Sequence, residues 1–307
     1  MPLYDLIIIG GGPAGIAAGI YAARQRLNTL LITKSFGGQI VRKAVAIENY
    51  PGFEEISGLE LIKKFEKHLR KQKIGVERDS VAEIKKAGKK FVVSTGRKNQ
   101  FEAKAVIIAS GADPRSLGIM GEKKFIGRGI SYCIACDASL FSDKIVAVIG
   151  GGNSGFEAAT ALSDWAKRIY ILEGGPKVFA DETNQERVKK TGKVKIITNA
   201  VLKEILGDKF VSSLVYQDRK SGREKTLPVK GVFVEIGSRH STLFAKGLVD
   251  LNEKDEIKVE LETCQTKTPG LFAAGDCNIG RYKQIVIAAG EGAKAALAAY
   301  NYLQNSK

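Results

Sequence analysis

The chain has 307 residues, of which 44% are hydrophobic, which is enough for two domains that each bury a core. Lysine and arginine total 48 against 33 aspartate and glutamate, and the formal charge of +15 would attract polyanions or an acidic protein surface. The basic residues are scattered and have no aromatic residues between them, so we interpret them as solvated faces and expect no nucleic-acid site. Four cysteines are too few for a disulfide scaffold, which favours a protein of the reducing cytoplasm.

The apolar segment at residues 6–23 has the composition of a signal peptide or a membrane span. Glycines and a proline interrupt it, no basic segment precedes it, and Arg24 follows without a small-residue cleavage site. We therefore expect a buried strand and helix there, with neither export nor a membrane span.

The opening of the chain repeats itself in pattern about 140 residues later. Each copy has an apolar β-rich strand, a glycine turn, an alanine-rich helix and a second strand. In the first copy we expect the strand at 3–9, the turn at 10–15, the helix up to about residue 26 and the second strand at 29–33. In the second copy we expect the strand at 145–149, the turn at 150–155, the helix up to about residue 166 and the second strand at 168–173. This repeat predicts two nucleotide-binding units.

Antiparallel strands are expected after each copy. They lie at 81–95, 101–109 and 194–233, with linkers at 111–114 and 238–241, a late strand at 270–274 and a final helix at about 290–303. The simplest layout is an α/β protein with two Rossmann-like domains, the second inserted into the first. Their expected boundaries are 1–112 with 242–307, and 113–241.

The first glycine fingerprint is Gly10-x-Gly12-x-x-Gly15. Its glycines suit a tight turn, close approach of the backbone to a pyrophosphate, and helix packing on the strand, and the helix amino terminus offers free N–H groups to that pyrophosphate. Such a motif alone could be an ordinary tight turn, but here it follows a strand and opens a helix. The usual ribose-binding acid is missing, because the second strand is expected to end in Thr33 and Lys34.

The second fingerprint, Gly150-x-Gly152-x-x-Gly155, is followed by Glu173 at the end of the next strand. A carboxylate at that position accepts hydrogen bonds from a ribose 2′-hydroxyl and repels a 2′-phosphate. The pattern therefore favours NADH over NADPH. The alternative is an exposed glutamate that merely ends a strand.

Cys133-x-x-Cys136 is the expected chemical centre. Cysteines at this spacing can form a disulfide. In the reduced pair, one thiol has a lowered pKa, so that a thiolate is available for exchange. A metal site would need two further ligands, but Cys264 and Cys277 form no second pair of this kind, and the two histidines sit in no ligand pattern. We expect those two cysteines to be inert core residues. Asp137 follows the pair, and a partly buried carboxyl there would have a raised pKa and could protonate a departing thiolate.

With these motifs in place, the sequence resembles the low-molecular-weight thioredoxin reductase family, and within it the reductase portion of the alkyl hydroperoxide reductase flavoprotein subunit. The resemblance covers nearly the whole chain. The matching stretches are 9–15 (IGGGPAG), 36–40 (FGGQI), 48–52 (ENYPG), 109–111 (ASG), 133–137 (CIACD), 150–158 (GGGNSGFEA), 273–276 (AAGD) and 282–285 (YKQI).

By this resemblance the first fingerprint belongs to an FAD site and the second to a nicotinamide site. The implied FAD-binding residues are Gly10, Gly12, Pro13, Ala14, Gly15, Thr33, Gly38, Gln39, Asn49, Val81, Ser110, Gly111, Gly275, Asp276, Lys283, Gln284 and Ile285. The implied nicotinamide-binding residues are Gly150, Gly152, Asn153, Ser154, Gly155 and Glu173.

The resemblance also implies catalytic roles. Cys136 would be the sulfur next to the flavin, Cys133 the sulfur that attacks a partner disulfide, and Asp137 the acid. The family is known for a homodimer and for swinging its nicotinamide domain on two linkers, here near 111–114 and 237–241.

Two departures from the family pattern bear on the donor and the acceptor. NADPH-dependent members carry a His-Arg-Arg segment and a further arginine where this chain has 173–177 (EGGPK), which favours NADH or a donor that is not a nicotinamide. The chain begins at its first strand without the extra amino-terminal domains of the peroxide-reductase subunits, so we expect a separate protein as acceptor.

The resulting hypothesis is a ping-pong cycle from NADH, less favourably NADPH, through FAD and the Cys133/Cys136 disulfide to a thioredoxin- or glutaredoxin-like protein in the cytoplasm. An alternative is the same chemistry fed by ferredoxin or a deazaflavin. A remote alternative is a non-enzymatic binding protein with a basic surface, which leaves the ordered motifs unexplained.

Overall fold

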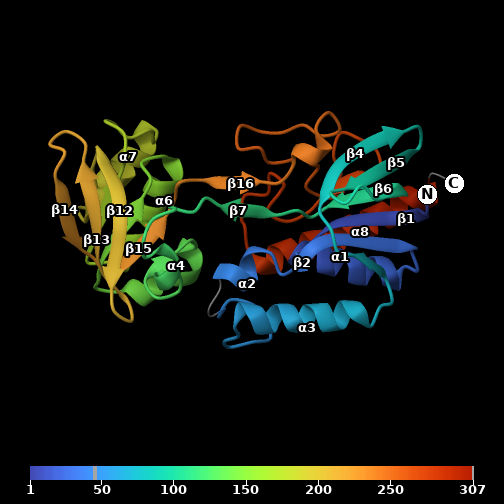
Figure 1. Cartoon of the computed structure of the whole chain (residues 1–307), viewed down its shortest axis with the longest axis horizontal. Coiled ribbons are helices and arrows are strands. Elements are labelled where there is room, and N and C mark those ends of the chain that lie inside the picture. The colour runs from blue at the N-terminus through green and yellow to red at the C-terminus, as the bar shows by residue number, and fades with distance from the viewer. Residues whose placement is uncertain (44–46, 306–307) are drawn as a thin grey trace. The chain divides into compact units, whose positions relative to one another are not determined.

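The computed structural model describes residues 1–43 and 47–305, which form two compact units (Figure 1). The first unit comprises Met1–Asp113 and Arg239–Lys307, and the second comprises Pro114–Ser238. Both are built on parallel sheets flanked by helices, so the expected α/β class with two nucleotide-binding folds is confirmed.

The sheet of the first unit has the order β3-β2-β1-β6-β5-β4, and β17 also pairs with β6. Strands β3, β2, β1, β6 and β17 run parallel, whereas β4 and β5 extend β6 as an antiparallel meander. The strands are β1 Leu3–Gly11, β2 Thr29–Phe36, β3 Gly75–Glu77, β4 Val81–Ala87, β5 Lys90–Thr95, β6 Gln100–Ile108 and β17 Leu271–Ala273.

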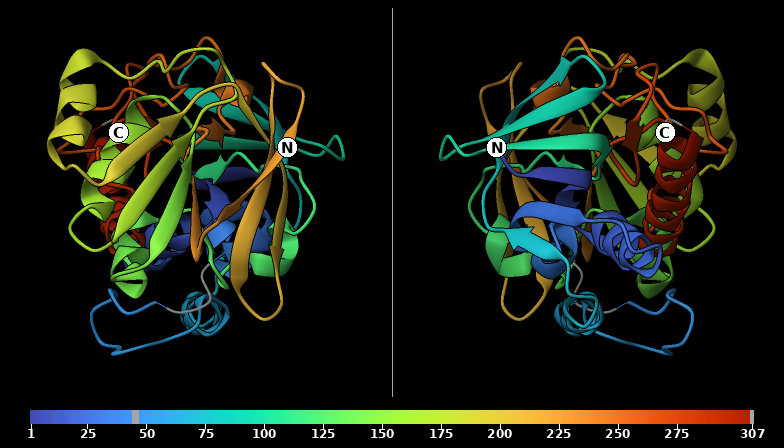
Figure 2. Two further views of the ribbon diagram at one scale, coloured as in Figure 1. Left: turned by 90° about the vertical axis from the view of Figure 1, so that its left-hand side faces the viewer. Right: turned by 90° about the vertical axis from the view of Figure 1, so that its right-hand side faces the viewer.

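Alternating residues of the central strand β1 face two different cores. Leu6 and Ile8 pack under the helices, and Ile7 and Ile9 pack on the opposite side, against the β4–β5 hairpin and the short 3-10 helix η2 (Leu243–Ala245). Helices α1 and α8 lie side by side on the first face (Figures 1 and 2). The helices are α1 Pro13–Arg24, α2 Gln39–Lys43, α3 Gly58–Arg70 and α8 Ile285–Asn305.

The second unit has a five-stranded parallel sheet in the order β11-β10-β9-β15-β8 and a separate antiparallel sheet, β12-β13-β14. The strands are β8 Ile130–Ser131, β9 Ile145–Ile149, β10 Arg168–Leu172, β11 Val194–Ile197, β12 Ala200–Gly207, β13 Val211–Asp218, β14 Glu224–Pro228 and β15 Gly231–Val234. The helices are α4 Glu122–Phe125, α5 Ile134–Asp137, the 3-10 helix η1 Ala138–Phe141, α6 Asn153–Leu162 and α7 Glu182–Lys190.

Several predicted elements need correction. The expected meander at 194–233 is split, because its two ends, β11 and β15, join the parallel sheet and only β12 to β14 are antiparallel. The expected linkers are strands β7 (Ala112–Pro114) and β16 (Ser238–His240), which pair with each other and thereby satisfy backbone groups that a loop would leave to solvent. Helix α8 begins before the expected glycine, since Ile285 packs against the core.

Among residues 1–43 and 47–305, none of the helices has both the length and the apolar character that crossing a bilayer requires.

Candidate functional site

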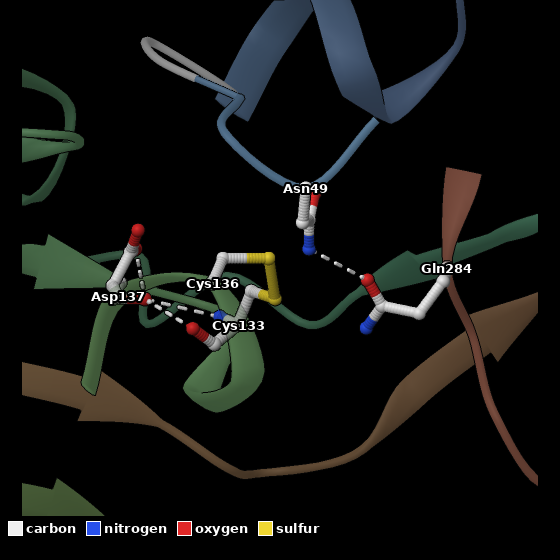
Figure 3. The surroundings of a disulfide bond; sticks show 6 residues. Asn49, Cys133, Cys136, Asp137 and Gln284 are labelled. Carbon is white, nitrogen blue, oxygen red and sulfur yellow. Dashed lines mark hydrogen bonds between the residues drawn. A yellow bond between two sulfur atoms is a disulfide. The ribbon is translucent and has the colours of Figure 1, made fainter. Parts of the chain in front are cut away.

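Cys133 and Cys136 form a disulfide in the second unit, with their Cα atoms 5.3 Å apart (Figure 3). Strand β8 ends at Ser131, and Cys133 is the amino-terminal cap of the single-turn helix α5, so this one turn brings Cys136 next to Cys133. Cys133 is half-buried, whereas Cys136 is exposed. The pair is therefore a disulfide, as the redox interpretation of the motif predicted.

Asp137 lies at the end of α5, and its Oδ2 is 2.6 Å from the hydroxyl of Ser131. Burial raises the pKa of the Asp137 carboxyl, and the hydrogen bond with Ser131 partly offsets this because it favours the charged form. The expected direction of the shift is confirmed. Ser131 Oγ also accepts a hydrogen bond from the Cys133 N–H at 3.0 Å, so Asp137 and the backbone of Cys133 share one hydroxyl.

The second fingerprint forms a tight turn between β9 and α6. A Cβ atom at Gly155 would lie 2.0 Å from the carbonyl oxygen of Gly150, so only glycine fits there. No side chain of the described residues caps α6, whereas α7 is capped by Asp181, which accepts from the Asn184 N–H at 2.8 Å. The free amino terminus of α6 offers its N–H groups to an anion.

Glu173 follows β10 and is held against this turn. Its Oε2 accepts from the Gly151 N–H at 2.9 Å, and its Oε1 accepts from the Gly175 N–H at 2.7 Å. The carboxylate is therefore fixed beside the fingerprint and keeps lone pairs free for a ribose hydroxyl. Two neighbouring residues are Asn153, whose Oδ1 accepts from the Asp181 N–H at 2.8 Å, and the exposed Ser154.

The first fingerprint repeats this geometry in the first unit. A Cβ atom at Gly15 would lie 1.9 Å from the carbonyl oxygen of Gly10. Gly12 precedes Pro13 and Ala14 at the start of α1, which no side chain of residues 1–43 and 47–305 caps. A Cβ at Gly12 would meet open space, so the turn can receive a bulky anion.

Thr33 does not end its strand as predicted, because β2 continues to Phe36. Its Oγ1 donates to the carbonyl oxygen of Ser35 at 2.7 Å and would lie 2.8 Å from a Cβ at Gly11. Glu173 Oε2 would lie at the same distance from a Cβ at Gly151. Thr33 thus occupies in the first unit the place that Glu173 has in the second.

A polar cluster in the first unit joins predicted residues that are distant in sequence. Gln39 Nε2 donates to Asp276 Oδ2 at 2.8 Å. Asn49 Nδ2 donates to Gln284 Oε1 at 3.2 Å (Figure 3). Burial raises the pKa of the Asp276 carboxyl. Lys283 forms an ion pair with Glu256 at 3.0 Å, and its charge also acts on Asp276, where it opposes the effect of burial.

The other predicted residues of the first unit differ in how close they lie to the fingerprint. Ser110 follows Ala109, whose carbonyl oxygen would lie 2.1 Å from a Cβ at Gly10. Gly38, Gly111 and Gly275 have positive φ angles of 53°, 68° and 79°, and Ile285 starts α8. Val81 starts β4 and packs with the core on the hairpin side of the sheet, apart from the cluster around Phe36 and Ala14.

Three residues of the second unit were missed. Ser131 belongs to no motif, and Glu235 comes next to the turn only because β15 pairs with β9. Phe179 is 66% exposed although apolar, and its N–H donates to the Gly151 carbonyl oxygen at 2.8 Å. Cys264 and Cys277 are buried free thiols, as expected, and burial raises the pKa of each to about 11.

Comparison with known proteins decides the family. Residues 4–292 match the family model described as pyridine nucleotide-disulphide oxidoreductase. The chain belongs to this family. A thioredoxin reductase from Streptococcus pyogenes MGAS5005 is similar in structure, with a TM-score of 0.93, 36% identity and 99% of both chains covered. A thioredoxin reductase from Giardia duodenalis gives a TM-score of 0.94 at 32% identity, covering 99% of this chain and 100% of that one.

Curated relatives of this oxidoreductase are longer. An alkyl hydroperoxide reductase subunit of Escherichia coli (strain K12) is 40% identical over 309 residues, which are 99% of this chain and 59% of that protein. A protein named NADH dehydrogenase from Bacillus subtilis (strain 168) is 40% identical over 302 residues, 98% of this chain and 58% of its own length. The chain thus spans less than two thirds of these relatives, and the expected resemblance to thioredoxin reductases and to the peroxide-reductase subunit is confirmed.

Proposed function

We propose that the chain is an FAD-containing, NADH-dependent protein-disulfide reductase of the thioredoxin reductase type. The observation that carries the proposal is the Cys133–Cys136 disulfide beside a half-buried carboxyl, in the same unit as a dinucleotide fingerprint. The description of the family names a pyridine nucleotide and a disulphide, which correspond to these two parts, and a non-enzymatic binding protein would leave their combination unexplained.

The first fingerprint has the features that an FAD site requires. The uncapped amino terminus of α1 and the open space at Gly12 suit a pyrophosphate. Ser110 Oγ is buried, and the interaction recorded for it among the described residues is with the Cys277 thiol, a weak hydrogen-bonding group, so its hydroxyl could serve a cofactor. Gln39, Asn49, Asp276 and Gln284 would hold the flavin end. When bound, FAD supplies a two-electron relay between a nicotinamide and a disulfide.

Glu173 supports NADH as the donor. Two backbone N–H groups fix its carboxylate beside the fingerprint, where it would accept from a ribose hydroxyl and repel a 2′-phosphate. Phe179, which is apolar, lies next to the turn at Gly151, and Lys177 is the basic residue in the segment between Glu173 and Phe179. A relative of this chain is named NADH dehydrogenase, which also supports a nicotinamide donor.

The acceptor we propose is a thioredoxin- or glutaredoxin-like protein, by analogy with the structurally similar thioredoxin reductases. A homodimer in the cytoplasm is part of the same proposal. The Cys133 thiolate attacks the partner disulfide and forms a mixed disulfide, and the expelled partner thiolate takes the proton of Asp137. The Cys136 thiol then gives its proton to Asp137 and displaces the second partner thiolate from Cys133, which restores the internal disulfide.

Replacing Glu173 tests the nucleotide assignment. Glu173→Gln removes the charge that opposes a 2′-phosphate, so the ratio of kcat/KM for NADPH to that for NADH should rise about tenfold or more, because apposed like charges cost more than about 1.4 kcal/mol. Steady-state rates with both donors measure this ratio. Glu182→Gln, in the first turn of α7, is the matched control and should leave it unchanged. An unchanged ratio in Glu173→Gln would remove Glu173 from the nucleotide site.

A further inference from the structure

Ser131 links the acid Asp137 to the backbone of Cys133, and no sequence motif assigned it a role. We propose that its hydroxyl is a two-position switch, which donates to Asp137 when that carboxyl is charged and to the Cys133 carbonyl oxygen when it is protonated. The two positions of the Ser131 proton depend only on the geometry around Asp137 and Cys133, whereas their use in disulfide exchange rests on the proposed function.

The geometry allows both positions. Ser131 Oγ is 2.6 Å from Asp137 Oδ2 and 3.2 Å from the carbonyl oxygen of Cys133, and it accepts from the Cys133 N–H at 3.0 Å. Ser131 is only 3% exposed, so water does not compete for its proton. A hydroxyl has a single proton and two acceptor sites, so it can donate to only one of the two oxygens at a time.

The protonation state of Asp137 decides which oxygen receives the proton. A charged carboxylate has no proton to give, so Ser131 must donate to it, and this charge-assisted bond is the stronger of the two. A neutral Asp137 can donate its own proton to Ser131 Oγ, which frees the Ser131 proton for the Cys133 carbonyl. In both states the Ser131 hydroxyl, the Asp137 carboxyl and the Cys133 N–H are satisfied.

The charged neighbours of this pair are few. Strands β8 and β15 contain no ionisable residue, and Asp137 is the one carboxyl of α5 and η1. The only ionisable residue of α6, which packs on α5, is Glu157, and its charge acts on Glu235. Burial raises the pKa of Asp137 and the Ser131 bond lowers it, so Ser131 is the main group that opposes burial.

The switch would serve the exchange reaction. When Asp137 gives its proton to the departing partner thiolate, it becomes a carboxylate and Ser131 turns to donate to it. When the Cys136 thiol returns a proton to Asp137, the Ser131 proton goes back to the Cys133 carbonyl. Ser131 is thus a positioning residue, which keeps the pKa of Asp137 low enough for the proton to leave and return in each cycle.

The oxidised holoenzyme can be tested without a partner or a nicotinamide. The 13C signal of the Asp137 carboxyl, assigned with Asp137→Asn, gives its pKa as the midpoint of a pH titration. Ser131→Ala should raise this midpoint by about one pH unit, because a hydrogen bond to a charged group is lost. Two control variants should leave the midpoint of the Asp137 titration unchanged. Ser131→Thr keeps a hydroxyl at position 131, and Ser139→Ala removes the hydroxyl of an exposed serine instead of that of Ser131.

A second measurement is a pH titration of the wild type. The carbonyl 13C signal of Cys133, assigned with Cys133→Ser, should titrate with the same midpoint as the Asp137 carboxyl, and in Ser131→Ala its amplitude should fall. A Cys133 carbonyl signal that stays constant through the Asp137 titration would overturn the switch. An unchanged Asp137 midpoint in folded Ser131→Ala would do the same. Failure of the chain to reduce any protein disulfide would instead count against the proposed function and leave both titrations interpretable.

Discussion

At the scale of single residues, the chemistry of the second unit depends on carboxyl groups whose surroundings differ. Glu173 is fixed by two backbone N–H groups, and Asp137 is half-buried beside a hydroxyl. Glu235, one residue past β15, has its pKa raised to about 7 by burial and by the charge of Glu157. Each of these carboxyls lies at the end of a different element of one unit.

Glu235 should make the stability of the second unit depend on pH. Its folded-state pKa of about 7 exceeds the usual 4.5, so the native state binds the extra proton, and stability falls as the pH rises from about 4.5 through about 7. Glu235→Gln should therefore raise the free energy of unfolding by about 1 to 2 kcal/mol at pH 8 and leave it unchanged at pH 4, the full effect being reduced because the side chain is only half-buried.

Trp165, the single tryptophan, lies in the second unit and reports its unfolding in denaturant by fluorescence. Glu224→Gln, at an exposed position of β14, is the matched control. Equal stabilities of Glu235→Gln and wild type at pH 8 would show that the Glu235 carboxyl is not held in an unfavourable environment.

The sequence predicted some of these residues and not others. Glu173 and Asp137 could be predicted because their positions relative to a glycine turn and a cysteine pair are fixed along the chain. Ser131 and Glu235 could not, because strand pairing and a turn of α5 bring them to the site. The end of β2 could not be predicted either, because the strand continues to Phe36 through the pairing of Phe36 with Gly11, past an irregularity that has no sequence signal.

At the scale of elements, the first fingerprint depends on the packing of α1 against α8. Gly292 of α8 lies against the backbone of α1, where an added Cβ would be 2.0 Å from the carbonyl oxygen of Ala14. Ala14 is in the first turn of α1, next to the proposed pyrophosphate position. The packing of two helices thus sets the position of the fingerprint.

Gly292→Ala should destabilise the first unit by about 1 to 3 kcal/mol, because the methyl group must push α8 away from α1. It should also weaken the binding of FAD. Gly290→Ala is the matched control on the same helix, where a Cβ meets open space, and it should be neutral or stabilising by up to about 1 kcal/mol. Denaturant unfolding followed by circular dichroism, with FAD fluorescence as a second signal, measures both. Equal effects of the two substitutions would contradict this account of the packing.

Element boundaries were predicted well where one face of an element is buried and poorly where pairing partners are distant. Strand β1 and helix α1 follow from an apolar run and an alanine-rich stretch. The strands β7 and β16 have three residues each, follow a glycine and lack an apolar run, and only their pairing with each other makes them strands. The start of α8 was placed late because its first turn is stabilised by packing of Ile285 rather than by a capping residue.

At the scale of the whole molecule, the repeat of one glycine turn in two units indicated two nucleotide-binding folds. The two units differ in the side chain that lies against the turn, which is Thr33 beside Gly11 in the first unit and Glu173 beside Gly151 in the second. This difference fits two ligands with different requirements at the ribose, FAD in the first unit and NADH in the second.

The central claim is that electrons pass from NADH through FAD to the Cys133–Cys136 disulfide. An anaerobic titration of the purified holoenzyme with NADH, followed by flavin absorbance and by counting thiols, tests it most directly. We predict a yellow protein that gains thiols as NADH is added, whereas Cys136→Ser should take up about half as much NADH per flavin, since only FAD remains to accept electrons. A colourless protein that does not bind FAD, or equal NADH uptake by the wild type and the variant, would contradict the account.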